Sequence, residues 1–260
     1  MSTLQLSSAE LCVALSALEV NPRPFIDSSD LLALTRADLT LVLLAARESL
    51  VTRGLAAAKP DNSLEIGELV RGMLLQIVQP QTAFEMLHAQ AGKPAQRIRF
   101  NFAAVSIIAH TFVNAHTHEF EQTMEIADVT RRVMAAATPP DTRNTAGGGA
   151  VTMPHATFVR LARTPPDPDA QLMALLERSG LNIELAAGVL KAGSHPTHQT
   201  VFTALAQRGN KLQSRAIMWF SDADSCWLIT DFNQHGNVVM MPATAPTIHQ
   251  AVDAIVAASL

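Results

Sequence analysis

Residues 200–241 constrain the fold of this chain more than any other part of the sequence. They read TVFTALAQRGNKLQSRAIMWFSDADSCWLITDFNQHGNVVMM, with four apolar runs rich in β-branched and aromatic residues separated by the polar turns GNKLQS, DADS and NQHGN. Turns this short join antiparallel strands, because a crossover between parallel strands needs a dozen or more residues. The sequence therefore predicts a four-stranded antiparallel meander.

The central hairpin of this meander allows its two faces to be assigned. If the turn is centred on residues 223 and 224, Phe220 pairs with Trp227 and Trp219 pairs with Leu228. Alternation along the strands then gives one face with Met218, Phe220, Trp227 and Ile229, and another with Ile217, Trp219, Leu228 and Phe232. Both faces are apolar, so either helices cover both sides or one side is an interaction surface.

The same order of elements is predicted twice along the chain. In the first half we expect helices at 4–18, 34–55 and 64–78, strands at 82–90, 97–102, 105–113 and 119–124, and a helix at 126–137. In the second half we expect helices at 154–162, 169–178 and 181–192, strands at 200–207, 215–221, 226–232 and 238–241, and a helix at 244–258. At an offset of about 118 residues Lys93 falls on Lys211 and Arg97 on Arg215, which indicates an internal repeat.

These elements predict an α+β protein built from two copies of a helix–antiparallel meander–helix unit. Residues 1–140 form the first α+β repeat with its N-terminal helices, and residues 153–260 form the second. Residues 141–152, which include the run DTRNTAGGGA, form the linker. We expect the two halves to pack as one structural unit.

Composition excludes several classes of function. Nucleic acid is not expected as a partner, because the net charge is −4 and Lys and Arg are not clustered. Cys12 and Cys226 are too few for a disulfide framework or a four-thiolate zinc site, which favours a reducing cytoplasm. Glu10 interrupts an N-terminus that lacks a basic region, and no apolar run reaches about 18 residues. We therefore expect a cytoplasmic protein without a signal peptide or membrane insertion.

Histidines are the strongest candidates for catalysis. His110, His116 and His118 could supply three nitrogen ligands to a catalytic zinc ion, so a metal-dependent enzyme is the alternative hypothesis. Solvated turn histidines explain the same pattern more simply. His198 belongs to a second small cluster, which we interpret as the loop that follows a helix. Cys226 lies in a predicted apolar strand and is expected to be core. No catalytic set remains, so we predict no cofactor and a protein that is not an enzyme.

Two segments carry a family resemblance. Residues 43–55, LLAARESLVTRGL, are similar to an early helix of the EspG family that ends in A-R-x-x-L-x-x-R-G-L. Residues 218–228, MWFSDADSCWL, resemble a late hairpin of that family with the turn D-T-x-x-G-R-Y-L, although Ser225 replaces the usual Gly and Cys226-Trp227 replace Arg-Tyr. EspG proteins are cytosolic chaperones of type VII (ESX) secretion.

The resemblance implies a pseudo-twofold α+β fold and a helical client of the PE–PPE type, whose apolar tip the chaperone keeps soluble until export. An apolar groove with a polar rim would suit such a client. The resemblance points to a partner-binding surface at the loop 91–96 and the strand after it, with Trp219 as an aromatic anchor unless its ring is core. The candidate partner-binding residues are Lys93, Gln96, Arg97, Arg99, Asn101 and Trp219. A scaffold that forms homo-oligomers through its sheet edges is a further hypothesis.

Overall fold

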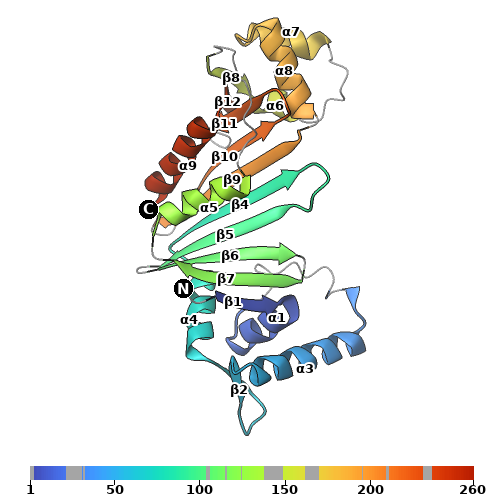
Figure 1. Cartoon of the computed structure of the whole chain (residues 1–260), viewed down its shortest axis with the longest axis vertical. Helices are drawn as coiled ribbons and strands as arrows, with labels where there is room; N and C mark the ends of the chain where they lie inside the picture. Colours follow the sequence, from blue (N-terminus) through green and yellow to red (C-terminus); the bar gives the residue numbers. More distant parts are fainter. Residues whose placement is uncertain are drawn as a thin grey trace. The chain divides into compact units, whose positions relative to one another are not determined.

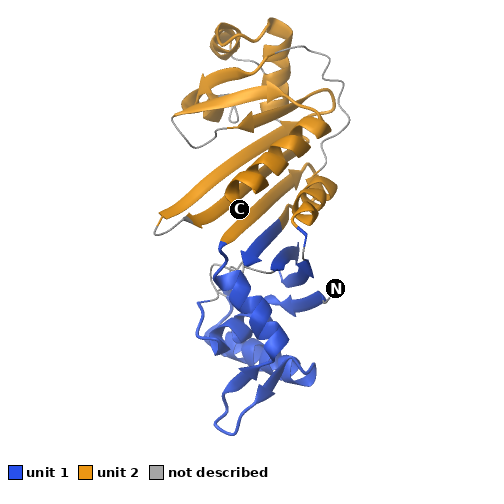
Figure 2. Ribbon diagram, turned by 90° about the vertical axis from the view of Figure 1, so that its left-hand side faces the viewer, with its two compact units in different colours: residues 1–81, 98–125 blue, residues 82–97, 126–260 orange. Residues whose placement is uncertain are grey.

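The computed structural model describes residues 3–21, 31, 33–103, 106–114, 116–123, 125–137, 149–161, 170–194, 196–208, 211–230 and 236–260. The chain divides into two compact units (Figure 2). Unit 1 comprises residues 1–81 and 98–125, and unit 2 comprises residues 82–97 and 126–260. Both combine helices with antiparallel strands, so the predicted α+β class is confirmed. In the described part of the chain no helix has the length and apolar character needed to cross a membrane.

Unit 1 begins with a strand that the sequence did not predict. Its elements are β1 (Thr3–Ser7), α1 (Ser8–Ala17), α3 (Arg36–Thr52), β2 (Ala56–Ala58), β3 (Leu64–Ile66), α4 (Glu68–Val78), the larger part of β5 (Gln96–Ala103), β6 (Ser106–Asn114) and β7 (Thr117–Thr123) (Figure 1). β7 pairs with β1 on one side and with β6 on the other, both antiparallel. Leu4 and Leu6, which we assigned to a helix, alternate along β1 and lie opposite Phe120 and His118 of β7.

Unit 2 contains the predicted meander. Its elements are β4 (Thr82–Gln90), α5 (Ala127–Ala137), β8 (Val151–Pro154), α6 (His155–Leu161), α7 (Ala170–Arg178), α8 (Ile183–Ser194), β9 (His198–Arg208), β10 (Lys211–Ser221), β11 (Cys226–Thr230), β12 (Asn237–Pro242) and α9 (Ala245–Ser259). The strands lie in the order β4-β9-β10-β11-β12-β8 and are all antiparallel (Figure 1). The predicted pairs of Phe220 with Trp227 and of Trp219 with Leu228 are confirmed. Phe232 lies outside the described residues.

The pairing of β4 with β9 matches what a repeat at an offset of 118 residues would produce. Glu85 and Thr203 are 118 positions apart and face each other across the two strands. On either side of this pair, Phe84 faces Ala204 and Met86 faces Phe202. At the same offset Phe84 is equivalent to Phe202 and Met86 to Ala204, so the two strands pair symmetrically about Glu85 and Thr203. Both halves of the chain also run from a strand through helices to four strands and a closing helix. The duplication and its boundaries stay a prediction, and residues 141–148 of the predicted linker lie outside the described residues.

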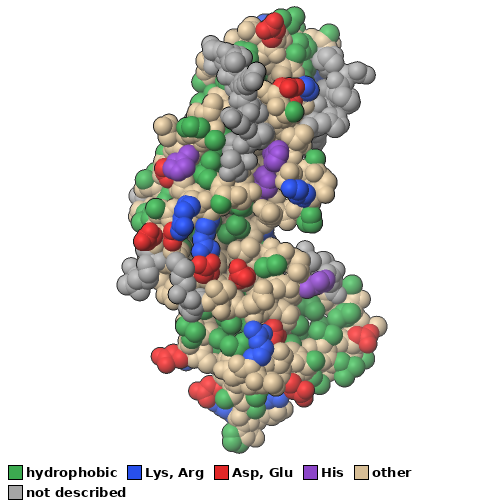
Figure 3. Space-filling model, in the orientation of Figure 1, with side chains coloured by type: hydrophobic (Ala, Val, Ile, Leu, Met, Phe, Trp, Pro, Cys, Tyr) green, Lys and Arg blue, Asp and Glu red, His purple; other side chains and the backbone are tan. Residues whose placement is uncertain are grey.

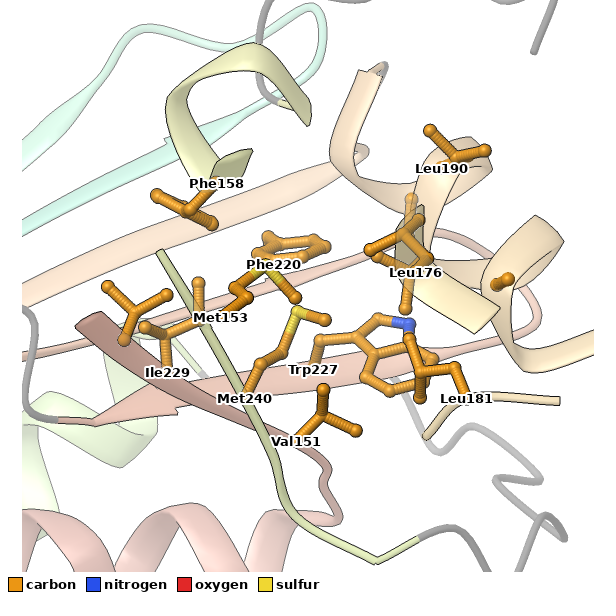
Figure 4. Close-up of a cluster of buried hydrophobic side chains, with 14 of the residues drawn as sticks. Val151, Met153, Phe158, Leu176, Leu181, Leu190, Phe220, Trp227, Ile229 and Met240 are labelled. Atoms are coloured by element: carbon orange, nitrogen blue, oxygen red, sulfur yellow. The ribbon is translucent and has the colours of Figure 1, made fainter. Parts of the chain in front are cut away.

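Helices cover both faces of the meander at its β10–β11 hairpin. Phe220 and Trp227 point into an apolar cluster with residues of α7, α8 and β8 (Figure 4). On the opposite face the indole N–H of Trp219 donates to the carbonyl of Ala137 at the end of α5, at 3.2 Å. α9 packs against β9 and β10 on the face that Trp219 occupies. At this hairpin, therefore, both sides of the sheet are covered by helices, which was one of the two alternatives that the sequence left open.

The segment 43–55 of α3 ties unit 1 together through a buried carboxylate. Glu10, in the first turn of α1, accepts hydrogen bonds from the hydroxyl of Ser49 and from the guanidinium of Arg53, each at 2.7 Å, and from the backbone N–H of Ser7. Arg53 also donates to the backbone carbonyl of Gln5 on β1. Leu50 is fully buried, and Gly54 adopts a φ of +68°, which glycine accommodates best. Residues 43–55, which carry the resemblance to the EspG family, therefore stabilise the fold of unit 1.

The first two turns of α3 leave apolar side chains in solvent. Leu39, Val42, Leu43, Ala46 and Leu50 recur at three- and four-residue steps along this helix, but only Ala46 and Leu50 of these are buried. Leu41 is 64% exposed, and Figure 3 shows hydrophobic side chains gathered over this helix. Apolar periodicity marks one stripe of a helix, but the stripe is buried only where a neighbouring element covers it.

Candidate protein-binding surface

One face of the sheet in unit 2 is exposed along β4, β9 and the first half of β10. Side chains on paired residues share a face, and Leu87 is paired with Val201, Thr203 with Ala216, and Gln207 with Leu212. Leu87 is 47% exposed and Leu212 is 71% exposed. We call this surface the open sheet face and define it by its partly or fully exposed members, Glu85, Leu87, Val201, Thr203, Leu205, Leu212, Ser214 and Ala216.

The opposite face of the same strands is closed. Phe84 and Phe202 are fully buried there, and their rings stack at 5.8 Å between centroids. α5 packs against β4, and α9 packs against β9. The hydroxyl of Thr82 donates to the carbonyl of Ser259 at the end of α9. Since the two helices occupy this side, the open sheet face is the side of these strands that remains available to a partner.

An ion pair places charge on the open sheet face beside its aliphatic side chains. Nη2 of Arg97 lies 3.0 Å from Oε2 of Glu85, and both side chains are about one-third exposed. A pair this exposed contributes only about 0–1 kcal/mol to folding, because water screens it. Its chief effect is to combine polar groups with apolar surface, as at the rim of a protein interface.

The structure separates the predicted partner-binding residues into two groups. Lys93 and Gln96 are exposed at the turn between β4 and β5, where Gly92 has a φ of +74° and the N–H of Lys93 donates to Gln90. Arg97 pairs with Glu85, and Arg99 is half-buried. These four residues remain candidates for contact with a partner.

Asn101 and Trp219 are not surface residues. Asn101 is fully buried. Its side-chain Nδ2 lies 3.5 Å from the backbone carbonyl oxygen of Ile108, and its backbone carbonyl accepts a hydrogen bond from the side-chain amide of Gln76. Trp219 is also fully buried, so the assignment of this ring as an exposed anchor is corrected to a core role. Alternation along a strand separates its two sides, but which side is buried depends on the elements that cover it.

The most exposed aliphatic residue of the open sheet face was not expected from the sequence. Leu212 lies in the run GNKLQS, which we interpreted as a turn, whereas β10 begins at Lys211 and pairs with β9 up to Arg208. The signal that could have found it is the Gly-Asn dipeptide, which is typical of two-residue hairpin loops. A loop of that length would have placed Leu212 on the same face as Leu205 and Val201.

The three histidines of the metal-enzyme alternative do not converge. Nε2 of His110 lies 2.9 Å from Nδ1 of His118, and Nε2 of His118 lies 3.0 Å from the hydroxyl of Ser8. Both rings are buried, and both nitrogens of His118 are engaged in hydrogen bonds. His116 is exposed in the turn, where its backbone N–H donates to Asn114. Over the described ranges no three His, Cys, Asp or Glu side chains are grouped to hold a metal ion.

Cys226 and the neighbouring turn are structural. Burial raises the pKa of the Cys226 thiol to about 12, so it stays protonated and unreactive at neutral pH. Oδ1 of Asp222 accepts from the backbone N–H groups of Asp224 and Ser225, which closes the turn. The hydroxyl of Ser225 accepts from the indole N–H of Trp227 at 3.3 Å. Two of the departures from the EspG hairpin pattern are therefore in contact with each other.

Comparison with known proteins gives a likeness of fold. No protein-family model matches this sequence, and no curated protein matches it. Among solved structures it is similar to the Mycobacterium tuberculosis type VII secretion system chaperone EspG5, whose structure was determined in complex with a PE25–PPE41 dimer. The TM-score is 0.71, and the match covers 97% of this chain and 95% of the EspG5 chain at 11% identity. The predicted EspG-like fold is confirmed, and at this identity the likeness concerns the fold alone.

Proposed function

We propose that this protein is a cytosolic, chaperone-like module that binds a helical secretion substrate of the PE–PPE type and keeps it soluble. The observation that carries the proposal is the likeness, over nearly the whole of both chains, to a chaperone whose structure was determined with a PE25–PPE41 dimer. The candidate catalytic groups support a role in binding, since His110, His118 and Cys226 are buried in structural contacts.

The open sheet face provides a suitable chemistry for a helical client. Its exposed leucines, Leu87 and Leu212, flank half-buried Val201 and Leu205, so an apolar helix face laid across these strands would bury all four side chains. Each aliphatic side chain that becomes fully buried contributes about 1.5–3 kcal/mol relative to full exposure. The gain here is smaller per residue, because these side chains are already partly covered.

The polar residues around the turn between β4 and β5 would set specificity. Lys93, Arg97 and Arg99 give this part of the chain a positive charge, and Gln96 offers a neutral donor and acceptor. Charged groups at the rim of an interface mainly affect the association rate and the choice of partner. A client with acidic residues beside its apolar stripe would match this arrangement.

A crosslinking experiment in the native host tests the proposal. A photoreactive amino acid at Leu212 should capture a helical secreted protein or pair, identified by mass spectrometry. The matched control carries the same group at Leu69, an exposed leucine of α4 in unit 1. The proposal fails if Leu212 captures no protein, or if both positions capture the same set of proteins. Light scattering on the purified chain tests the homo-oligomer hypothesis separately.

A further inference from the structure

We propose that His88 and His198 form a binding site for a divalent transition-metal ion of the zinc, nickel or copper type. The two residues lie near the end of β4 and at the start of β9, and their ring centroids are 5.7 Å apart with a tilt of 31°. His88 faces Thr200 across the strands, and Gln90 faces His198, so the imidazoles are diagonal neighbours on the face of the sheet that α5 and α9 cover. The sequence pattern had placed His198 in a loop after a helix.

His88 is held in the way that a metal-binding histidine usually is. Its Nδ1 lies 2.8 Å from the hydroxyl oxygen of Thr200, which is fully buried. If Nδ1–H donates to this hydroxyl, the lone pair is on Nε2, and such a contact fixes both the tautomer and the orientation of the ring. Metal ions bind the neutral form of an imidazole ring through such a lone pair.

Two buried polar atoms beside His88 indicate that the cluster accepts a ligand. Within the described residues, Nδ1 of His198 and the hydroxyl of Ser221 are buried and have no hydrogen-bond partner. Ser221 is the direct cross-strand neighbour of His198, so both atoms belong to one small region. Buried polar atoms are nearly always satisfied by protein, water or an ion. Two imidazoles are the preferred nitrogen ligands of zinc, nickel and copper, and a hydroxyl oxygen can complete the set.

The ligand set predicts an open, moderate-affinity site. Two histidines cannot fill the four positions of a closed structural zinc site, so water would occupy the remaining positions. His198 is only half-buried, which gives an ion access to the pair. A bound ion would link β4 to β9 and would stabilise the folded state, because it binds folded chains in preference to unfolded ones. This inference is independent of the proposed binding of a helical client.

Metal titration of the protein without a His-tag tests the site. We expect calorimetry with Zn²⁺ to show one saturable equivalent, and Co²⁺ to give visible absorption bands from nitrogen ligation. His198→Ala should weaken Zn²⁺ binding at least tenfold. The matched controls His116→Ala and His249→Ala remove exposed histidines elsewhere and should bind as the parent protein does. Zn²⁺ should raise the Tm of the parent protein and of both controls, but not that of His198→Ala.

A second variant keeps the test decisive, because His88 is buried and its removal endangers folding. Thr200→Val retains the shape of the threonine side chain but removes the contact that orients His88. It should weaken Zn²⁺ binding while circular dichroism shows an unchanged fold. The proposal is wrong if the parent protein shows no saturable binding, or if His198→Ala binds Zn²⁺ as tightly as the parent protein.

Discussion

Unit 1 and unit 2 each bury an apolar cluster between sheet strands and helices, but unit 1 also buries a network of hydrogen-bonded polar side chains. In unit 2 the strands β10, β11 and β12 contribute Phe220, Trp227 and Met240 to an apolar cluster (Figure 4). In unit 1 the strands β6 and β7 contribute Ile108 and Phe120 to an apolar cluster. They also contribute His110 and His118, which hydrogen-bond to each other beside Phe120.

The polar contacts of unit 1 continue at the edge of its sheet. The carboxylate of Glu10 is buried and joins α1 to α3 through hydrogen bonds from Ser49 and Arg53. Arg53 also donates a hydrogen bond to a backbone carbonyl of β1. Buried polar groups are tolerated only when each finds partners. The comparison therefore predicts that unit 1 is sensitive to the loss of single hydrogen bonds, whereas unit 2 is sensitive to the loss of volume.

The largest effect is expected from Trp227→Ala in unit 2. The ring is 1% exposed and packs within the apolar cluster, so its removal leaves a large cavity. We expect a loss of about 3–5 kcal/mol in the free energy of unfolding, measured by urea denaturation. Trp227→Phe is the control that retains most of the volume and should lose much less. Equal losses for the two variants would show that the indole hydrogen bond to Ser225, and not volume, stabilises this cluster.

In unit 1 the corresponding test is Glu10→Gln, which changes almost no volume. An amide at this position has only one acceptor oxygen and brings an NH₂ group among the donors of Ser7, Ser49 and Arg53. We expect a loss of about 2–3 kcal/mol in urea denaturation, since hydrogen bonds to charged groups are involved. A loss below about 0.5 kcal/mol would mean that the carboxylate network does not stabilise unit 1, and the contrast with unit 2 would disappear.

Acid should act through the same carboxylate. Burial raises the pKa of Glu10, but hydrogen bonds from Ser7, Ser49 and Arg53 and the charge of Arg53 outweigh it, so the pKa lies below the usual 4.5. A lowered folded-state pKa gives stability that is complete above the unfolded-state pKa and is lost as the pH falls through the folded-state pKa. The unfolding free energy should therefore decline below about pH 4.5, and less steeply in Glu10→Gln. Parallel pH profiles for both proteins would contradict this assignment.

His118→Phe tests whether the imidazole chain is needed. The substitution keeps an aromatic ring but leaves the hydroxyl of Ser8 and Nε2 of His110 without this partner. We expect a loss of about 2 kcal/mol, and amide hydrogen exchange should become faster in β6 and β7 while β11 and β12 are unaffected. A neutral or stabilising result would show that an apolar side chain, like those of the cluster around Trp227 in unit 2, serves equally well at this position of unit 1.

Local patterns in the sequence predicted the meander of unit 2 well. The position of the turn DADS predicted the correct register of β10 with β11. Asp222 closes this turn through hydrogen bonds, as its position in the sequence suggests. The short strands β1 and β8 were missed, because each is stabilised by pairing with a strand more than eighty residues away along the chain. Propensity within a short window does not contain that information.

The candidate site was predicted less well, because exposure is a tertiary property. Lys93 and Gln96 are exposed because they lie at a turn, which the sequence does mark. Leu87 on β4 and Leu212 on β10 are exposed because, among the described residues, no helix covers their side chains, and nothing in their own segments indicates this. Asn101 and Trp219 were misassigned for the converse reason, since distant elements cover them.

The variant with the smallest predicted effect, Ser49→Ala, tests whether several hydrogen bonds or a single ion pair stabilise the charge of Glu10 in unit 1. Ser49→Ala removes one of the donors to Glu10 and leaves the contact of Arg53 with the same oxygen in place. If the donors share the carboxylate, the loss should be about 1 kcal/mol, and the acid-dependent decline should become shallower because the pKa of Glu10 moves back toward its usual value. If Arg53 alone stabilises the charge, Ser49→Ala should leave both the unfolding free energy and its pH dependence unchanged. Urea denaturation at pH 7 and pH 4 separates these two outcomes. If Ser49→Ala behaves like the parent protein, the buried polar network that distinguishes unit 1 from unit 2 consists, at Glu10, of one salt bridge with Arg53.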